Sequence, residues 1–216
     1  MKIAIIGAGN MARGIATRAL AGGHAVTLTA KDQAKAVELA EQLEASAVGA
    51  ASVNAAESTS AVADAEIVVL AVPYAAAKQI VAGYGTQLDG KIVIDISNPV
   101  NASFDALTVE PGTSAAEEIA KLAAPGTHIV KAFNTTFAGT LVLGQVDGIP
   151  LDVFIAADDD GARKQVAALV ASGGLNPVDV GALSNARGLE GFQLLHMALQ
   201  LSGGGHGWMS TIKIVA

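Results

Sequence analysis

Short aliphatic runs alternate with alanine-rich helical segments along this chain of 216 residues. The runs contain consecutive Val, Ile, Leu and Ala rather than alternating polar and apolar positions, which is typical of parallel strands covered on both faces. The pattern predicts strands at residues 2–6, 25–29, 66–72, 91–96, 128–133, 151–156 and 177–180, with short ones at 47–53 and 211–215. It predicts helices at residues 10–21, 32–44, 74–81, 114–123, 160–171 and 185–201.

This order of elements predicts an α/β fold with a Rossmann-type, doubly wound, mostly parallel sheet and a small C-terminal α/β part. Turn-forming residues at 98–112 indicate a loop, after which Thr113 is the expected cap of the next helix. The Pro125-Gly126 turn suggests a boundary between a nucleotide-binding domain, residues 1–125, and a smaller domain, residues 126–216.

The first strand leads into Gly7-Ala8-Gly9-Asn10-Met11-Ala12, which matches the glycine fingerprint of dinucleotide-binding βαβ units. Gly7 permits the tight turn, Gly9 lets the backbone approach a pyrophosphate, and Ala12 allows close packing of helix and strand. The following helix supplies backbone amides and the positive end of its dipole. A strand before the motif and a helix after it make a dinucleotide site the favoured interpretation over a structural glycine turn.

The end of the second strand distinguishes NADP from NAD. A carboxylate that binds the ribose 2′-hydroxyl is expected about twenty residues beyond the fingerprint, but Ala30 occupies that position and Lys31 follows it. Lys35 lies one helical turn further, on the same face as Lys31. These cations suit a 2′-phosphate and predict NADP. The competing interpretation makes Asp32 the ribose ligand and leaves both lysines in solvent.

Two further strand ends are candidate cofactor contacts, because ligands of doubly wound sheets bind at the carboxyl ends of the strands. They are the Val72-Pro73-Tyr74 run and the Asn98-Pro99-Val100 run. The alternative is that the prolines only end the strands.

Composition narrows the possible partners. The net charge of −7 and the lack of a basic cluster argue against nucleic acid, and the absence of cysteine excludes thiolate chemistry. No apolar stretch is long enough for a membrane span and the N-terminus has no signal-peptide pattern, so a cytoplasmic protein is expected. The Asp158-Asp159-Asp160 run is better explained by helix capping than by a metal, and no metal site is predicted.

Several motifs together resemble the F420-dependent NADP reductases, also called NADPH:F420 oxidoreductases. They are GAGNMARGIA, EIVVLAVPY, KIVIDISNPV, HIVKAFNT and PVDVGALSNAR, which occur in the order and spacing of that family over essentially the whole chain. The resemblance implies an enzyme, usually a homodimer, that transfers a hydride between NADPH and a deazaflavin, coenzyme F420. It implies that residues 8–11 line the pyrophosphate and that Ala30, Lys31 and Lys35 surround the 2′-phosphate. The further dinucleotide contacts that it implies are Tyr74, Lys78, Val100, Phe137 and Ala138.

The acceptor side is less well defined. The resemblance implies a deazaflavin pocket around Gly204 and Gly205, with His206 and Gly207. Asn134, however, stands where archaeal-type members carry histidine, and the C-terminal tail is longer than theirs. Asn134 either binds a carboxamide or ring carbonyl or caps a turn, while His206 either offsets charge on a reduced ring or lies in solvent. The alternative functions are an NADPH-dependent flavin or ferric reductase and a non-catalytic NADP(H)-binding redox sensor.

Overall fold

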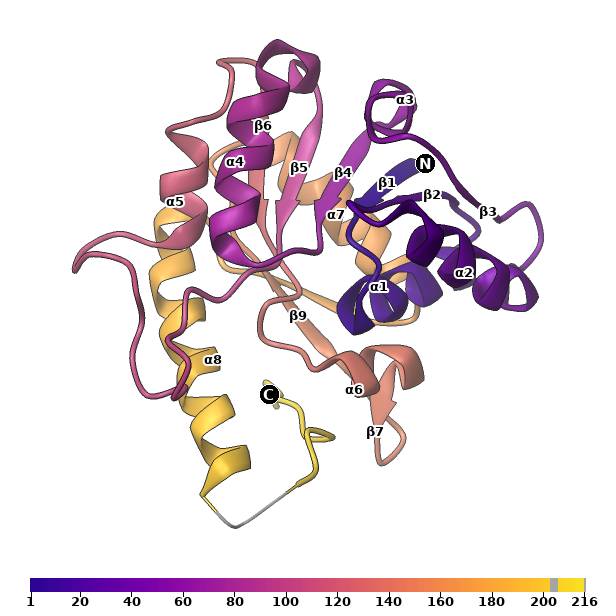
Figure 1. Ribbon diagram of the computed structural model, residues 1–216. Coiled ribbons are helices and arrows are strands. Elements are labelled where there is room, and N and C mark those ends of the chain that lie inside the picture. The colour runs from indigo at the N-terminus through magenta and orange to yellow at the C-terminus, as the bar shows by residue number, and fades with distance from the viewer. Residues whose placement is uncertain (203–205, 216) are drawn as a thin grey trace.

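The computed structural model describes residues 1–202 and 206–215, and a six-stranded sheet forms its centre (Figure 1). The strands are parallel and lie in the order β3-β2-β1-β4-β5-β6. This order is that of doubly wound dinucleotide-binding sheets and confirms the predicted Rossmann-type α/β fold. The strands are β1 (Lys2–Ile6), β2 (Ala25–Thr29), β3 (Ser52–Ala55), β4 (Ile67–Leu70), β5 (Ile92–Asp95) and β6 (His128–Lys131).

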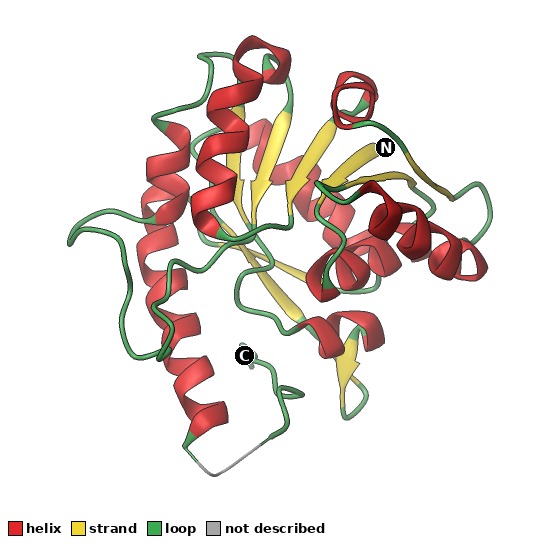
Figure 2. Ribbon diagram, viewed as in Figure 1, coloured by secondary structure: helices red, strands yellow, loops and turns green. Residues whose placement is uncertain are grey.

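Helices cover both faces of this sheet (Figure 2). One face packs on α1 (Asn10–Ala21), α2 (Gln33–Leu43) and α7 (Asp160–Ser172). The other face packs on α3 (Ser58–Asp64), α4 (Tyr74–Tyr84) and α5 (Ala115–Ala120). The two aliphatic cores explain why the strands read as continuous apolar runs, because both of their faces are buried.

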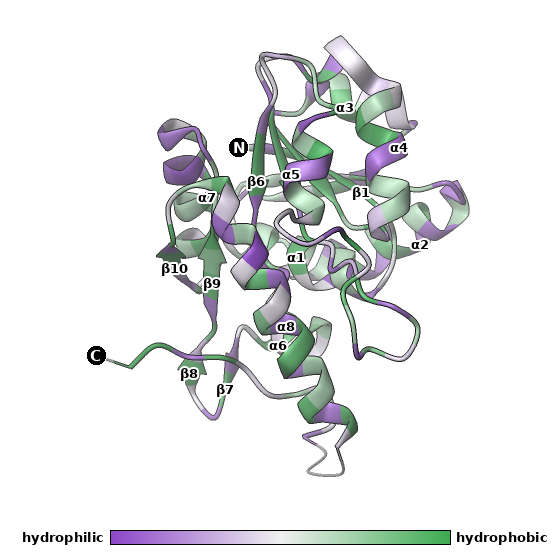
Figure 3. Ribbon diagram, turned by 90° about the vertical axis from the view of Figure 1, so that its left-hand side faces the viewer, coloured by the Kyte–Doolittle hydropathy of each residue, from purple (hydrophilic) through white to green (hydrophobic). Residues whose placement is uncertain are grey.

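The C-terminal part adds a second, two-stranded parallel sheet of β9 (Asp152–Ile155) and β10 (Asn176–Asp179). A short antiparallel bridge between Lys131 and Ala156 joins β9 to the end of β6. Helix α6 (Ala138–Leu143) and a small hairpin of β7 (Gln145–Val146) and β8 (Ile149–Pro150) precede β9. Helix α8 (Ala186–Leu201) then runs past α5 and away from the main sheet, and hydrophilic and hydrophobic residues alternate along it (Figures 1 and 3).

Three local predictions were wrong. The strand expected at residues 47–53 lies at 52–55, because Gly49 adopts a left-handed turn with φ of +63°. The strand expected at 211–215 is irregular, and the amide of Ile214 binds the Asp152 carboxylate instead of a strand partner. The cap of α5 is Ser114 rather than Thr113, because Ser114 accepts a hydrogen bond from the amide of Glu117, the spacing of a capping box.

Strand β6 begins just beyond the expected domain boundary at residue 125 and pairs with β5 along its full length. The first segment of the predicted smaller domain therefore belongs to the main sheet. Helix α8 in turn packs against α5, which precedes the boundary. The division into residues 1–125 and 126–216 stays a prediction.

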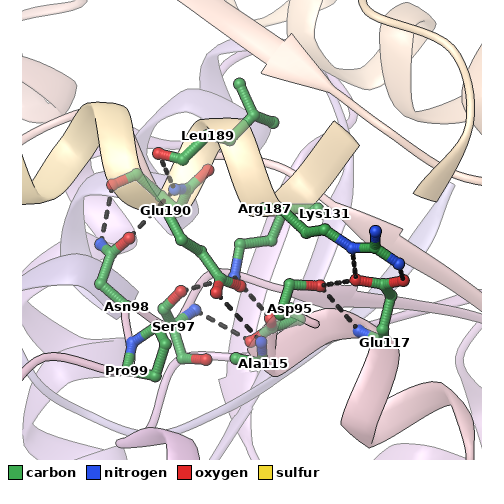
Figure 4. A network of polar contacts seen from close by, with 12 residues as sticks. Asp95, Ser97, Asn98, Pro99, Ala115, Glu117, Lys131, Arg187, Leu189 and Glu190 are labelled. Atoms are coloured by element: carbon green, nitrogen blue, oxygen red, sulfur yellow. Dashed lines mark hydrogen bonds and ion pairs between the residues drawn. The ribbon is translucent and has the colours of Figure 1, made fainter. Parts of the chain in front are cut away.

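A buried ion cluster connects α8 to the sheet (Figure 4). The Lys131 ammonium lies 2.7 Å from Asp95 Oδ2, its register partner on β5, and 2.7 Å from Glu190 Oε1 on α8. It also donates to the carbonyl of Ser97 at 2.6 Å. All three ionisable side chains are fully buried. One lysine therefore holds the two strand ends and the helix together.

Backbone amides complete the cluster. The amide of Ser97 donates to Asp95 Oδ1, and the amide of Ala115, in the first turn of α5, donates to Glu190 Oε2. Burial raises the pKa of the Glu190 carboxyl, and the Lys131 ammonium opposes that rise. The cluster holds two carboxylates and one ammonium, so the lysine cannot be removed without leaving buried charge unpaired.

We predict that Lys131→Met lowers the free energy of unfolding by about 3–5 kcal/mol at neutral pH, because it strands two carboxylates in the interior. Without the ammonium the folded-state pKa of Glu190 rises further above its unfolded value. Stability from such a group is present at low pH and is lost as pH rises. Urea unfolding at about pH 8 and pH 5 should therefore show a smaller loss at the lower pH. An equal loss at both would contradict this account.

Candidate functional site

The turn between β1 and α1 brings the backbone of two adjacent strands together. Gly7 has φ of +126°, and a Cβ atom there would overlap the carbonyl oxygen of Ala71 at the end of β4. The Gly7 amide donates to the Thr29 carbonyl of β2 at 2.8 Å. Gly7 thus occupies the crossover point of the sheet, where β1 lies between β2 and β4, and the ligand crevice of such sheets opens there.

The fingerprint leaves space above the first turn of α1. Gly9 is the N-cap of the helix and provides no side-chain cap, and the first turn carries no acidic residue. Among the described residues no atom lies within 4 Å of a Cβ built on Gly9. An uncapped helix start beside open space suits an anionic group such as a diphosphate.

A cleft of about 780 Å³ opens from this point, and we call it the strand-end cleft. It is lined by residues 9–11 after β1, residues 71–75 after β4, residues 96–102, 104 and 108 after β5, and Met197 of α8. Of the predicted dinucleotide contacts, it includes Gly9, Asn10, Met11, Val72, Pro73, Tyr74, Asn98 and Val100. The expected loop at 98–112 is irregular as predicted and forms one wall.

The predicted 2′-phosphate contacts lie just outside this cleft. Ala30 directly follows the end of β2, whose Thr29 carbonyl binds Gly7. Lys31 and Lys35 are exposed, and the Lys35 ammonium lies 3.9 Å from Asp32 Oδ2. The two cations are therefore accessible to a ligand at the edge of β2. The choice between these lysines and Asp32 as the ribose ligand stays a prediction.

Lys78 has a protein partner. Its ammonium donates to Glu118 Oε2 at 2.8 Å and to the Tyr74 hydroxyl at 3.2 Å, and that hydroxyl also binds Glu118. The hydrogen bond to Glu118 raises the pKa of Lys78, so it stays charged. Lys78 does not line the strand-end cleft, and its contact is with Tyr74, which does.

A second pocket of about 420 Å³ adjoins the first, and we call it the tail pocket. The two share Asn10, Met11, Ile96, Asn98 and Met197. The remaining lining comes from residues 134, 136 and 137 between β6 and α6, residues 138 and 139 at the start of α6, Gln193 of α8, and residues 207–209 of the C-terminal tail. The structure thus brings Asn134 and Gly207, predicted for the acceptor, together with Phe137 and Ala138, which were predicted as dinucleotide contacts and do not line the strand-end cleft. Gln193, Met197 and Met209 were not identified from the sequence.

Asn134 is held in a single orientation. Its Nδ2 donates to the carbonyl of Leu189 at 3.2 Å and to Asn98 Oδ1 at 3.0 Å, while Asn98 Nδ2 donates to the Asn134 carbonyl at 2.9 Å. A carbonyl acceptor at Leu189 fixes which end of the Asn134 amide is the donor. Asn134 Oδ1 is buried and has no partner among the described residues. The amide therefore bridges two segments rather than capping the following turn through its side chain.

The C-terminal tail closes this pocket with aromatic contacts. Trp208 packs edge-on against Phe137 at 5.2 Å and against Phe104 of the 98–112 loop at 6.3 Å between ring centroids. Predicted pocket residue His206 is exposed and lies outside the pocket lining. Gly204 and Gly205 lie outside the described residues, so their predicted role stays a prediction.

The other charged features have structural explanations. Asp159 caps α7 by accepting from the amide of Ala162, as the capping interpretation predicted, and Asp160 pairs with Lys164. Across residues 1–202 and 206–215, no three acidic or histidine side chains gather where they would bind a metal ion. Over the same residues, no helix combines the length and the apolar character that crossing a lipid bilayer requires.

Comparisons with known proteins agree with this geometry. The family model described as NADP oxidoreductase, coenzyme F420-dependent, matches residues 2–99. The F420-dependent NADP reductase of Methanothermobacter marburgensis is 32% identical over 206 residues, which cover 88% of each chain. A solved structure from Arthrobacter sp. FB24, described as a candidate F420-dependent NADP reductase, superposes with a TM-score of 0.83 and 28% identity over both full chains.

A second kind of relative matches largely the same stretch of this chain. The metalloreductase STEAP3 of Rattus norvegicus is 31% identical over 193 residues, 89% of this chain. The chain spans only 36% of the length of that protein. A reductive aminase from Aspergillus terreus superposes with a TM-score of 0.67 at 20% identity, which shows a common fold.

We predict that Gly7→Ala lowers the free energy of unfolding by about 2–4 kcal/mol, because the added Cβ meets the Ala71 carbonyl and the backbone is left-handed. Gly9→Ala is the matched control: its φ of −91° suits any residue and its Cβ meets open space, so it should cost about 1 kcal/mol or less. Thermal and urea unfolding of both variants measures the difference. Equal losses would show that the turn tolerates a side chain at Gly7.

Proposed function

Because the chain belongs to the family of F420-dependent NADP reductases and is an NADP-dependent oxidoreductase, we propose that it transfers a hydride between NADPH and coenzyme F420. The observation that carries this proposal is the continuity of two pockets. The strand-end cleft starts at the uncapped α1 terminus and shares five lining residues with the tail pocket. One elongated dinucleotide can occupy the first while a ring-shaped acceptor occupies the second.

The strand-end cleft fits the dinucleotide. The first turn of α1 faces the pyrophosphate, with Gly9 leaving room for its oxygens. Lys31 and Lys35 bind the 2′-phosphate at the edge of β2, where Ala30 avoids the repulsion that a carboxylate would cause. Val72, Pro73, Asn98 and Val100 continue the cleft toward Met197, where the nicotinamide end meets the tail pocket.

The tail pocket fits the acceptor. When both are bound, the reduced nicotinamide supplies a hydride to the central ring carbon of the deazaflavin, and a proton from solvent completes the reduction. Such a transfer needs the two carbons about 3–3.5 Å apart with no water between them, and the walls of the pocket would provide this. Phe137 and Trp208 form apolar walls, while Asn134 supplies a fixed polar contact. No acid–base residue is needed for the hydride itself.

We expect the purified protein to reduce F420 when NADPH is supplied, which is seen as a loss of the absorbance of oxidised F420. The reduction should be much slower with NADH. Stopped-flow or steady-state absorbance measures both rates. Gly9→Ala, which the fold tolerates, should weaken NADPH binding because its methyl occupies the pyrophosphate space. A folded sample that binds NADPH but never reduces F420 would refute this acceptor.

The lysines should act through the 2′-phosphate. We predict that Lys31→Ala raises the dissociation constant of NADPH by about tenfold, since a charge-assisted contact is lost, and leaves that of NADH unchanged. Lys164→Ala, which removes an exposed lysine from α7, is the control and should change neither. Calorimetric titration measures both nucleotides. A preference for NADH in the native protein, or equal weakening of both nucleotides, would favour Asp32 as the ribose ligand.

The similarity to STEAP3 over most of this chain favours a second candidate, an NADPH-dependent flavin or ferric reductase. A flavin is also a flat tricyclic ring and would use the same pocket. Turnover with FMN or FAD and an iron chelate, measured beside F420, distinguishes the two acceptors. On the family resemblance we further propose that the protein is cytoplasmic and forms a homodimer. Light scattering of the purified chain tests the homodimer.

A further inference from the structure

Two residues that line the tail pocket each carry a buried polar atom without a partner among the described residues. These atoms are Asn134 Oδ1, an acceptor, and Gln193 Nε2, a donor. Both side chains are 1% exposed. A buried polar group without a partner is unfavourable, so two such groups on residues that line one pocket raise the question of which ligand could pair with them.

The orientation of the Asn134 amide is fixed by the Leu189 carbonyl, as described above. The orientation of the Gln193 amide depends on a chain of hydrogen bonds that begins in the C-terminal tail. Gln200 Oε1 accepts from the backbone amide of Trp208 at 3.2 Å, and Gln200 Nε2 donates to the carbonyl of His196 at 3.3 Å. Backbone groups at both ends leave the Gln200 amide one orientation.

The chain continues through Ser210. Gln200 Nε2 donates to Ser210 Oγ at 2.8 Å, and Ser210 Oγ lies 2.8 Å from His196 Nε2. Since Ser210 accepts from Gln200, its own proton is satisfied by donation to His196 Nε2. Burial lowers the pKa of His196, so the ring is neutral at neutral pH. Its single proton then lies on Nδ1.

His196 Nδ1 lies 3.2 Å from Gln193 Oε1. A protonated Nδ1 donates to the oxygen of the Gln193 amide, and the reverse orientation would place two donors against each other. The N–H groups of Gln193 therefore point away from His196 and remain free. The chain of hydrogen bonds contains only neutral groups. Because it starts at the backbone amide of Trp208, the position of the tail determines that Gln193 keeps a free N–H.

We propose that Asn134 Oδ1 and Gln193 Nε2 together recognise an amide edge, meaning one carbonyl oxygen beside one N–H. Gln193 donates to the carbonyl of the ligand, and Asn134 accepts from its N–H. This inference rests on the proposed function, because both of its substrates carry such an edge. One source is the carboxamide of the nicotinamide, and the other is the carbonyl and ring N–H of a deazaflavin or flavin.

Gln193→Glu tests the pair, because it keeps an oxygen for His196 and replaces the free donor by an acceptor. We expect the variant to weaken one ligand by about tenfold or more. Calorimetry with NADP+ measures the carboxamide source, and the KM for F420, or for FMN where that is the acceptor, measures the ring source. Gln87→Glu, the same change at an exposed position of the 3-10 helix η2 (Gly85–Leu88), is the matched control. If Gln193→Glu and Gln87→Glu have the same NADP+ affinity and the same KM for the acceptor, the proposal is wrong.

Failure of the proposed function has a different signature. If native protein binds NADP+ but reduces no F420, the F420 assignment fails while the NADP+ titration and FMN turnover still decide the role of Gln193. The 3-acetylpyridine analogue of NADP+, which keeps the carbonyl and lacks the N–H, tests Asn134. Native protein should bind it more weakly than NADP+ if the carboxamide is the source, and equally if the ring is.

The hydrogen-bond chain has a readout that does not depend on activity. Nitrogen-15 NMR of the native protein should show His196 as the Nδ1–H tautomer. Ser210→Ala removes the donor to Nε2 and should shift this ring toward the other tautomer, with a smaller loss of ligand affinity than Gln193→Glu causes. Native protein with the proton on Nε2 would reverse the Gln193 amide and overturn the assignment.

Discussion

The buried ammonium of Lys131 is the constraint on which the site depends. It ties the ends of β5 and β6 to Glu190, and thereby fixes α8 against the sheet edge. Gln193 lies one turn and Met197 two turns further along α8, and both line the tail pocket. A buried ion pair is weak evidence of net stabilisation, since desolvation offsets the attraction. Its contribution here is positional, because the contact with Lys131 requires α8 to turn Glu190 toward the sheet.

The two halves of the site are built differently. The strand-end cleft is formed mainly by residues that directly follow strand ends; a Cβ on the neighbouring Gly7 would clash with Ala71, and one on Gly9 would enter open space. The tail pocket is formed by side chains from segments distant in sequence, including Asn134 and Gln193. Sites of the first kind suit a phosphate, whose charge is common to all nucleotides. Sites of the second kind can distinguish one ring from another.

This difference explains what the sequence could predict. The sheet, the helices α1 and α8 and the parts of the strand-end cleft at residues 9–11, 72–74 and 98–100 followed from aliphatic runs and one glycine motif, since local pattern determines them. Gln193 carries no local signal, and its role emerges only when Ser210 of the tail folds back onto α8. Asp95 and Lys131 were visible as charges inside aliphatic strands. Their pairing required the strand register, which periodicity does not supply.

The tail pocket is lined by apolar side chains and neutral hydrogen-bonding groups, with no ionisable side chain among its described lining, and this suits the proposed hydride transfer. A buried charge beside the rings would favour one redox state, because the two states of the nicotinamide differ by a full positive charge. In the proposed recognition, Asn134, Gln193 and the neutral His196 would orient a ligand without adding that bias. The nearest buried charges belong to the Lys131 cluster, which does not line either pocket through an ionisable side chain. For the proposed hydride transfer, this separation of the structural charges from the ring site would favour neither direction.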